Sequence, residues 1–156
     1  MAGERFMRMA IATAREGIEK GQSPFGACIV KDGEVLACAH NVVWSDSDIT
    51  AHAEVTAIRA VCAGLNAIDL SGSVIYSTCE PCPMCFAACH WARISRIVFG
   101  SRIEDAQGCG FSELTISNQR MKELGNSPVE LEGDFMHEEC VGLFREWSAR
   151  AGRRAY

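Results

Sequence analysis

His52-Ala53-Glu54 and, further along the chain, Pro81-Cys82-Pro83-Met84-Cys85 are the two stretches that decide the fold and the chemistry of this sequence. One imidazole and two thiols are good zinc ligands, and three protein ligands leave the fourth tetrahedral position to a water molecule. An open position of this kind is typical of a catalytic zinc site rather than a structural one. We therefore expect His52, Cys82 and Cys85 to bind Zn²⁺, with the carboxylate of Glu54 close to the metal.

Both halves of this motif are expected where helices begin, over residues 51–62 and 82–91. Unpaired N–H groups and the helix dipole make a helix start electropositive, which favours the thiolate that zinc requires. Cys82 and Cys85 are three residues apart and share a helix face. His52 and Glu54 are two residues apart, which on a regular helix would point them about 200° away from each other. They can converge only if His52 lies in or before the first turn.

The carboxylate of Glu54 is the candidate proton carrier. Zinc lowers the pKa of a bound water molecule, and Glu54 can take the proton that this water loses. It can then deliver protons to a ring nitrogen and to an exocyclic amine, which leaves as ammonia, because one carboxylate alternates between base and acid. The H-x-E and P-C-x-x-C spacing is the signature of zinc-dependent nucleobase deaminases, so we predict hydrolytic deamination.

Four cysteines offer a competing interpretation. Cys79, Cys82, Cys85 and Cys89 follow the C-x2-C-x2-C-x3-C spacing of bacterial ferredoxins. An iron–sulfur protein would leave His52 and Glu54 without a task, and no second cysteine group accompanies the pattern. A purely structural zinc, with Cys79 or Cys89 as its fourth ligand, is the other non-enzymatic alternative.

Length and composition predict a single domain over residues 1–156. The chain is 48% hydrophobic and has enough apolar residues for one core. No apolar run approaches the roughly twenty residues of a membrane span, and the start lacks the apolar region of a signal peptide. With nine cysteines, an odd number, a disulfide framework is not expected, and we expect a cytoplasmic protein. The net charge of −5 favours a small-molecule substrate over a nucleic acid.

The hydrophobic pattern predicts alternating helices and strands. Helical spacing covers residues 7–18, 51–62, 82–91, 117–124 and 136–147, and strands are expected at 25–30, 35–40, 73–77, 96–99 and 129–131. Lys31-Asp32-Gly33-Glu34 is a hairpin turn, and residues 41–50 are polar and loop-like. This order predicts an α/β fold, a three-layer α-β-α sandwich with a central five-stranded mixed sheet. The long link between strands four and five predicts that these two are parallel.

The chain resembles the cytidine deaminase-like zinc superfamily over nearly its full length, and within it the bacterial guanine deaminase branch. The stretches that carry the resemblance are Ser23-Pro24-Phe25-Gly26-Ala27, Asn41, Thr50 to Arg59, Cys79 to Cys85, Trp91-Ala92-Arg93 and Tyr156. The resemblance implies guanine as substrate, with xanthine and ammonia as products. It also implies that Phe25 and Trp91 pack against the base and that Asn41 hydrogen-bonds a ring edge.

The same resemblance implies an acidic contact to the base and a homodimer. Glu113 is the candidate acid, with Glu104 and Asp105 as alternatives. The C-terminal helix would cross to the partner subunit, and Tyr156 would cover the partner's pocket, with Gly152 ending the helix and freeing the last four residues as a lid. A tRNA adenosine deaminase remains an alternative, as does a deaminase of cytosine, of another amino-heterocycle or of a nucleoside.

Overall fold

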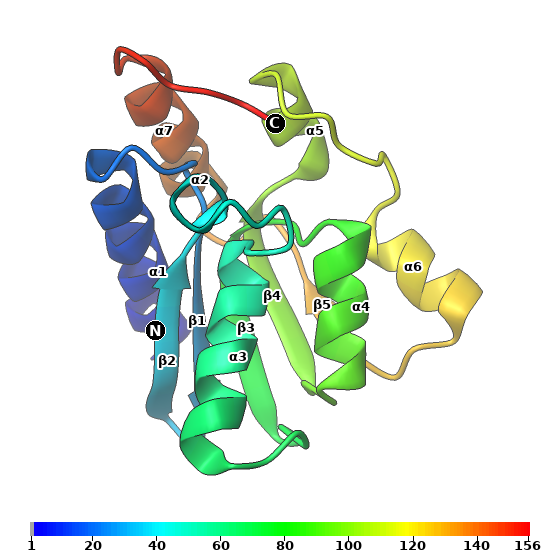
Figure 1. The fold of residues 1–156 in the computed structure, drawn as a ribbon. Helices are drawn as coiled ribbons and strands as arrows, with labels where there is room; N and C mark the ends of the chain where they lie inside the picture. The colour runs from blue at the N-terminus through cyan, green and yellow to red at the C-terminus, as the bar shows by residue number, and fades with distance from the viewer. Residues whose placement is uncertain (1) are drawn as a thin grey trace.

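Five strands form one mixed sheet in the computed structural model, which describes residues 2–156 (Figure 1). The strands are β1 (Gly26–Lys31), β2 (Glu34–His40), β3 (Ser73–Cys79), β4 (Arg96–Ser101) and β5 (Glu130–Glu132). Their order across the sheet is β2-β1-β3-β4-β5. β1 is antiparallel to both β2 and β3, whereas β4 is parallel to both β3 and β5. This confirms the predicted five-stranded mixed sheet with parallel strands four and five.

Helices cover both faces of the sheet, as Figure 1 shows. α1 (Ala2–Glu19) and α7 (His137–Ser148) pack together on one face. α3 (Ala53–Leu65) and α4 (Pro83–Trp91) cover the other face, with α6 (Asn118–Gly125) against α4. The predicted three-layer α-β-α arrangement is therefore confirmed.

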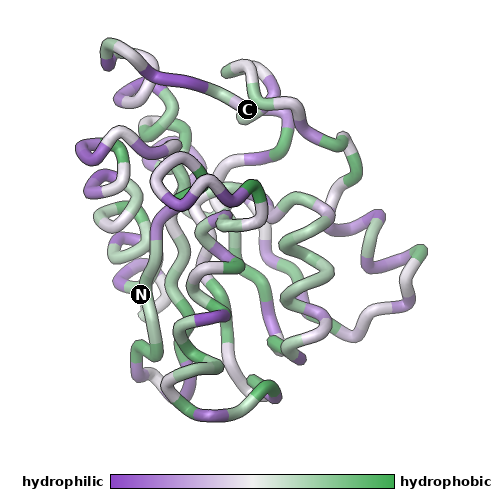
Figure 2. Tube along the Cα trace, in the orientation of Figure 1, coloured by the Kyte–Doolittle hydropathy of each residue, from purple (hydrophilic) through white to green (hydrophobic). Residues whose placement is uncertain are grey.

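The sheet has a separate hydrophobic cluster on each face. Cys28 and Val30 of β1 point into the cluster under α1 and α7, whereas Ala27 and Ile29 point into the cluster under α3 and α4. Successive strand residues face opposite sides of a sheet, so a strand covered on both faces is apolar throughout. Figure 2 shows this apolar centre, with hydrophilic residues gathered along α6. No helix of residues 2–156 combines the length and apolar character needed to cross a bilayer.

Two glycines are required by the geometry of β1. Asp32 and Gly33 both have positive φ, 51° and 78°, as the predicted two-residue hairpin turn demands. Gly26 lies directly beneath α1, where an added Cβ would approach the carbonyl oxygen of Ala10 to 2.2 Å. The absence of a side chain at Gly26 therefore lets β1 and α1 pack closely.

Strand directions explain why the two halves of the metal motif meet. β2 and β3 are both antiparallel to β1, so they run in the same direction and end at the same edge of the sheet. α3 follows β2 and α4 follows β3, and both cover one face. Both helices therefore begin at that edge, which brings His52 and Cys82 together from distant parts of the chain.

Two short helices were not expected. α2 (Val43–Asp46) lies in the segment 41–50, which the sequence analysis described as loop-like, and α5 (Ile103–Gly108) follows β4. Each spans less than two turns, so neither is long enough to display a helical period. The carboxylate of Asp105 accepts a hydrogen bond from the backbone N–H of Arg102 at 2.8 Å and thereby caps the start of α5.

Candidate metal centre and active site

His52 and Cys82 occupy equivalent places at the starts of α3 and α4. Each is the N-cap residue of its helix and has an extended backbone, with φ −63° and ψ 160° for His52 and φ −63° and ψ 166° for Cys82. Cys85 lies three residues into α4, and Pro83 occupies the first helical turn, where a missing N–H costs nothing. Because His52 precedes the first turn, it meets the condition set for convergence with Glu54.

The three predicted ligands are grouped as a zinc ion requires. Nδ1 of His52 lies 3.6 Å from Sγ of Cys82 and 3.6 Å from Sγ of Cys85, and all three ligand atoms lie within 4.8 Å of one another. Zinc binds sulfur at about 2.3 Å and nitrogen at about 2.0–2.1 Å, which in a tetrahedron separates the two atoms by about 3.5 Å. The donor set and its spacing therefore fit zinc, with His52 binding through Nδ1.

The surroundings of Cys82 favour its thiolate. A hydrogen bond from the Cys85 thiol lowers the pKa of Cys82 to about 4, and a hydrogen bond with His52 acts in the same direction. The same pairing raises the pKa of Cys85. Burial lowers the pKa of His52, whereas the hydrogen bond with Cys82 and the negative charge of Glu54 raise it. The net effect is a raised pKa. One sulfur is thus ready to bind a cation, and zinc binding releases the remaining protons.

Glu54 is buried beside the three ligands. Its side chain is 6% exposed, and burial raises the pKa of its carboxyl above 4.5. Oε1 accepts a hydrogen bond from Oγ of Ser77 at 2.9 Å, which fixes the carboxylate from the end of β3. Glu54, His52 and Cys82 border one narrow gap of about 20 Å³, which has room for roughly one water molecule. The carboxylate is therefore within reach of a water molecule at the metal centre.

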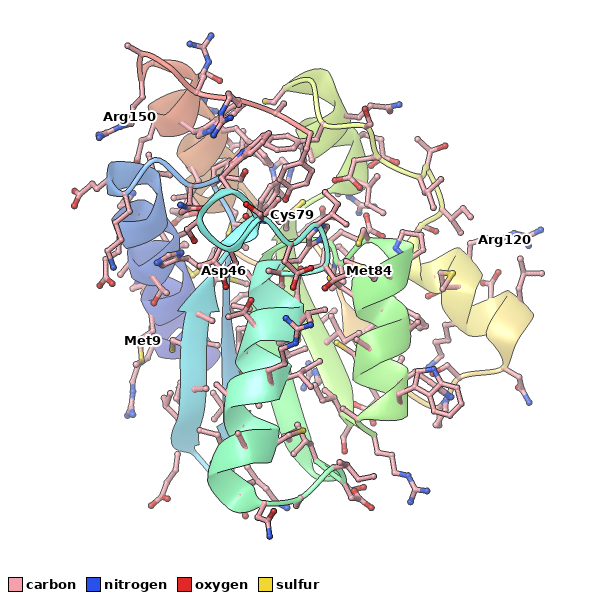
Figure 3. The ribbon with its side chains drawn as sticks, viewed as in Figure 1. Met9, Asp46, Cys79, Met84, Arg120 and Arg150 are labelled. Atoms are coloured by element: carbon pink, nitrogen blue, oxygen red, sulfur yellow. The ribbon has the colours of Figure 1, made fainter. Side chains whose placement is uncertain are left out.

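A larger cavity of about 320 Å³ opens directly above the ligands. His52 and Cys82 form its floor, and four consecutive residues, Phe111 to Leu114, line it together with Met84 at the start of α4. Figure 3 shows Met84 and Cys79 at the same end of the sheet as Asp46 of α2. Cavities of roughly 300–1,000 Å³ hold small ligands, so this cavity is large enough for a small heterocycle.

The C-terminal tail of the same chain borders this cavity, which Tyr156 lines. The ring of Tyr156 lies 5.6 Å from the His52 ring and 5.2 Å from the Phe111 ring, centroid to centroid. The carbonyl oxygen of Tyr156 accepts a hydrogen bond from the N–H of Ser112 at 2.8 Å. Nε1 of Trp44 donates to the carbonyl oxygen of Arg154 at 3.1 Å. These contacts hold the tail over the candidate site, and the exchange of this tail between two subunits stays a prediction.

The structure brings two of the predicted substrate residues, Phe25 and Tyr156, to the candidate site, and Asn41 is linked to the site through Tyr156. Asn41 is fully buried; its Oδ1 accepts from the N–H of Val43 at 3.0 Å, and its Nδ2 donates to the hydroxyl of Tyr156. Phe25 borders the narrow gap, with its ring 5.0 Å from that of Phe111. Tyr156 lines both the gap and the larger cavity.

Glu113 is the acidic residue that reaches the site. It lines both the gap and the larger cavity, and burial raises the pKa of its carboxyl to about 7. Of the two alternatives, Glu104 is exposed on α5, and Asp105 is occupied by the cap of α5 and by His137. The structure therefore favours Glu113 over both.

The prediction that Trp91 packs against the base is wrong for the chain's own cavity. Trp91 lies at the far end of α4 from Cys82 and is 81% exposed. It lines a separate depression at the opposite edge of the sheet with Ile68 and Arg93. Trp91 follows Cys82 by nine residues and Cys85 by six, so about 9–14 Å of helix, at about 1.5 Å per residue, separates it from these two ligands.

The two non-enzymatic alternatives find no support in the cysteine positions. Among the described residues, the group able to hold a metal consists of His52, Cys82 and Cys85. The thiol of Cys79 donates to the carbonyl oxygen of Arg102 at 3.5 Å, and Cys89 is buried in the cluster under α4. Burial raises the pKa of both thiols, which disfavours the thiolate that a cluster or a fourth zinc bond needs.

Three residues of the site carry no signal that sequence analysis could use. Ser77 holds the Glu54 carboxylate, Trp44 holds the tail, and Glu80 borders the narrow gap. A strand serine and a loop tryptophan are common in any domain, and their roles depend on partners distant in the chain. Glu80 is adjacent to the cysteine motif, but adjacency alone does not predict which groups its carboxylate contacts.

Comparisons with known proteins agree with this geometry. The family described as "Cytidine and deoxycytidylate deaminase zinc-binding region" matches residues 2–101. Guanine deaminase of Bacillus subtilis (strain 168) is 38% identical, and the alignment covers 100% of both chains. The tRNA-specific adenosine deaminase of the same organism is 37% identical over 92% of this chain and 89% of its own. A solved structure of guanine deaminase from Nitrosomonas europaea, 26% identical, superposes with a TM-score of 0.86 over 93% of this chain and 84% of its own.

Proposed function

Because the chain belongs to the cytidine and deoxycytidylate deaminase zinc-binding family, we propose that it hydrolyses guanine to xanthine and ammonia. The family supports a zinc-dependent hydrolytic deaminase, and the three grouped ligands and Glu54 supply the parts that such chemistry needs. The proposal goes beyond the family assignment in naming a free purine base as the substrate.

The position of the tail at the cavity is the observation that carries this preference. A space of about 320 Å³ lies above the ligands, and Tyr156 lines it while its hydroxyl accepts a hydrogen bond from Asn41. A free base is small enough to fit there beside the tail. An adenosine inside a tRNA loop carries ribose and phosphates on both sides and needs an open mouth for the strand to enter and leave. The tail position therefore favours a small, unsubstituted heterocycle.

Two polar side chains are assigned to substrate recognition in this proposal. Asn41 is fully buried and donates to the Tyr156 hydroxyl, so it fixes the tail residue that lines the cavity. Glu113 with a pKa of about 7 can either accept or donate a hydrogen bond near neutral pH. Phe25 borders the gap below and can contact the ring face. A site that pairs its buried polar groups with one substrate edge strongly rejects analogues that lack the edge.

The chain's own residues then perform the proton transfers. When bound, zinc supplies a Lewis acid that lowers the pKa of a water molecule toward neutrality. Glu54 accepts the proton of the attacking water and passes it to the ring nitrogen next to C2 of guanine. Glu54 then takes the remaining proton of that water from the new hydroxyl on C2 and delivers it to the exocyclic amine. The C2–N bond breaks, the amine leaves as ammonia, and C2 keeps the oxygen of the water as a carbonyl. Ser77 orients the Glu54 carboxylate through both transfers.

Deamination of adenosine in tRNA is the second candidate, because the matching Bacillus tRNA-specific enzyme is nearly as similar in sequence as the guanine deaminase. An ammonia-release panel with the zinc-loaded protein separates the candidates. It includes guanine, adenine, cytosine, their nucleosides and tRNA. We expect guanine to show the highest kcat/KM and to give xanthine. Ammonia release from tRNA alone would replace the proposal with the second candidate.

We also propose the homodimer that the resemblance implies, in which the C-terminal helix is exchanged between the two subunits. Light scattering of the purified protein gives the oligomeric state. Exchange predicts that a Tyr156→Phe chain mixed with a Glu54→Gln chain forms hybrid sites with altered turnover. Turnover equal to the sum of the two separate proteins would instead place each tail over its own cavity.

A further inference from the structure

Glu80 is a buried carboxylate that the proposed chemistry does not use. It follows the last residue of β3, precedes the metal motif by one residue, and is 5% exposed. Its backbone N–H donates to the carbonyl oxygen of Ser101 at 2.7 Å, so the residue is anchored to the end of β4. A buried carboxylate is costly without hydrogen-bond donors, and its partners indicate what it holds.

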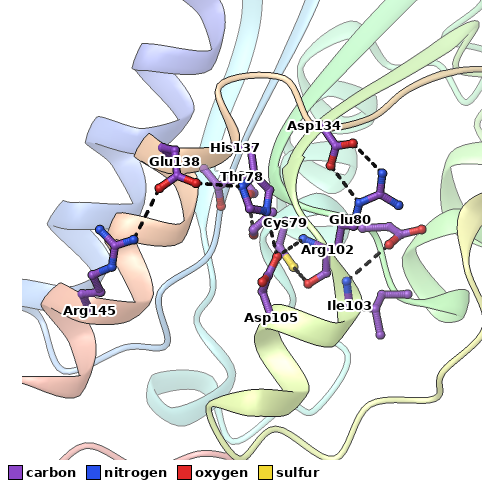
Figure 4. A network of polar contacts seen from close by, with 11 residues as sticks. Thr78, Cys79, Glu80, Arg102, Ile103, Asp105, Asp134, His137, Glu138 and Arg145 are labelled. Carbon is purple, nitrogen blue, oxygen red and sulfur yellow. Dashed lines mark hydrogen bonds and ion pairs between the residues drawn. The ribbon is translucent and has the colours of Figure 1, made fainter.

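Each oxygen of Glu80 accepts a hydrogen bond from the first residue of a different helix. Oε2 accepts from the N–H of Ile103 at 3.3 Å, at the start of α5, as Figure 4 shows. Oε1 accepts from the N–H of Asn118 at 2.8 Å, at the start of α6. Asn118 adds a second link, because its Nδ2 donates to the carbonyl oxygen of Pro81 at 2.6 Å. The segment that begins the cysteine motif therefore holds both helices.

The segment between α5 and α6 is residues 109–117, here called the 109–117 loop. Four of its residues, Phe111 to Leu114, line the cavity above the ligands, and one of them is Glu113. Glu80 thus fixes the two helices that begin on either side of this loop, while the metal ligand Cys82 lies two residues away along the chain. Glu80 therefore connects the loop that lines the cavity to the chain segment that carries the metal ligand.

We propose that Glu80 is a positioning residue for substrate recognition: its carboxylate sets the 109–117 loop, and with it Glu113, at a fixed place above the metal centre. Glu80 borders the narrow gap, but both of its oxygens are engaged by backbone N–H groups, so we assign it a role through the loop. It also lies outside the group of metal-binding side chains found in residues 2–156. The inference rests on the proposed function only for the choice of guanine as the probe.

Glu80→Gln tests this role, with Glu123→Gln on the exposed face of α6 as the matched control. A glutamine keeps the size but offers one accepting oxygen instead of two, and its NH₂ group opposes one backbone N–H. We expect one zinc per chain, kcat within about threefold of wild type and KM for guanine raised by about tenfold. Amide hydrogen exchange in residues 109–117 should speed up by about tenfold, with residues 52–65 unchanged.

Three results would overturn the proposal. They are a wild-type KM with wild-type exchange in the loop, a loss of zinc from the folded variant, and a fall in kcat with KM unchanged. If Glu80→Gln does not fold, Glu80→Asp keeps the charge but withdraws the carboxylate by one methylene from the N–H groups of Ile103 and Asn118, and it must show the same faster loop exchange and higher KM. If the wild type releases no ammonia from guanine, the proposed function fails, whereas zinc content and loop exchange still decide the role of Glu80.

Discussion

Replacing Glu54 by glutamine removes the proton carrier and keeps the side-chain volume. The side chain is 6% exposed and lies in the second position of α3, where Oγ of Ser77 donates to it at 2.9 Å. Glutamine can accept the same hydrogen bond through its Oε1, and none of the three metal ligands is altered. We therefore expect a folded variant with its zinc content unchanged.

The loss of turnover follows from the two proton transfers assigned to this carboxylate. A positioned general acid or base contributes about 10²–10⁴-fold in rate, equivalent to about 3–5 kcal/mol of barrier. Since one carboxylate serves both transfers, the loss of rate should lie near the upper end of this range. The fall should appear in kcat, because the glutamine leaves the larger cavity intact.

The assay is ammonia release from guanine, with zinc measured by atomic absorption and folding by thermal denaturation. Glu34→Gln, exposed at the hairpin far from the site, is the matched control and should keep full turnover. Retention of more than about a tenth of wild-type kcat by zinc-loaded Glu54→Gln would remove Glu54 from the mechanism. Loss of zinc from this variant would assign Glu54 to metal binding instead.

Three further predictions concern the loop, the tail and the core. Burial raises the pKa of Glu113 from 4.5 to about 7, so ionising it in the folded protein costs free energy and stability falls as pH rises through this window. In metal-stripped protein, the Tm of Glu113→Gln minus the Tm of wild type should therefore increase as the pH rises from about 5 to about 8. A Tm difference that does not change with pH contradicts this. Deleting residues 153–156 should raise KM for guanine by uncovering the cavity, and unchanged steady-state kinetics would show that the tail is dispensable. Gly26→Ala should destabilise the fold by about 1–3 kcal/mol, since its Cβ would meet the carbonyl oxygen of Ala10 at 2.2 Å; calorimetry showing an unchanged Tm would refute the close packing of β1 and α1.

The metal centre could be predicted because its signals are local. Two cysteines three residues apart at a helix start can bind one ion whatever surrounds them. The two-residue spacing of His52 and Glu54 even required a non-helical His52, and the N-cap conformation meets that requirement. The strand pattern succeeded for a similar reason, since each central strand is a short apolar run bounded by turn residues.

The parts that failed depend on distance along an element or on partners remote in sequence. Trp91 lies in the same helix as Cys85, yet the length of α4 carries it to the opposite edge of the sheet. α2 and α5 are too short to show a period. Glu80 gains its role from the first residues of two helices that begin at Ile103 and Asn118, and no spacing rule connects them.

Guanine turnover in oxygen-18 water tests the central claim most directly. Zinc-loaded protein is incubated with guanine, and ammonia and the mass of the purine product are followed together. The account predicts one ammonia per xanthine and one solvent-derived oxygen in each xanthine, because the water that Glu54 deprotonates becomes the new carbonyl oxygen. Guanine recovered unchanged from zinc-loaded, folded protein, or xanthine without the heavy oxygen, would contradict it.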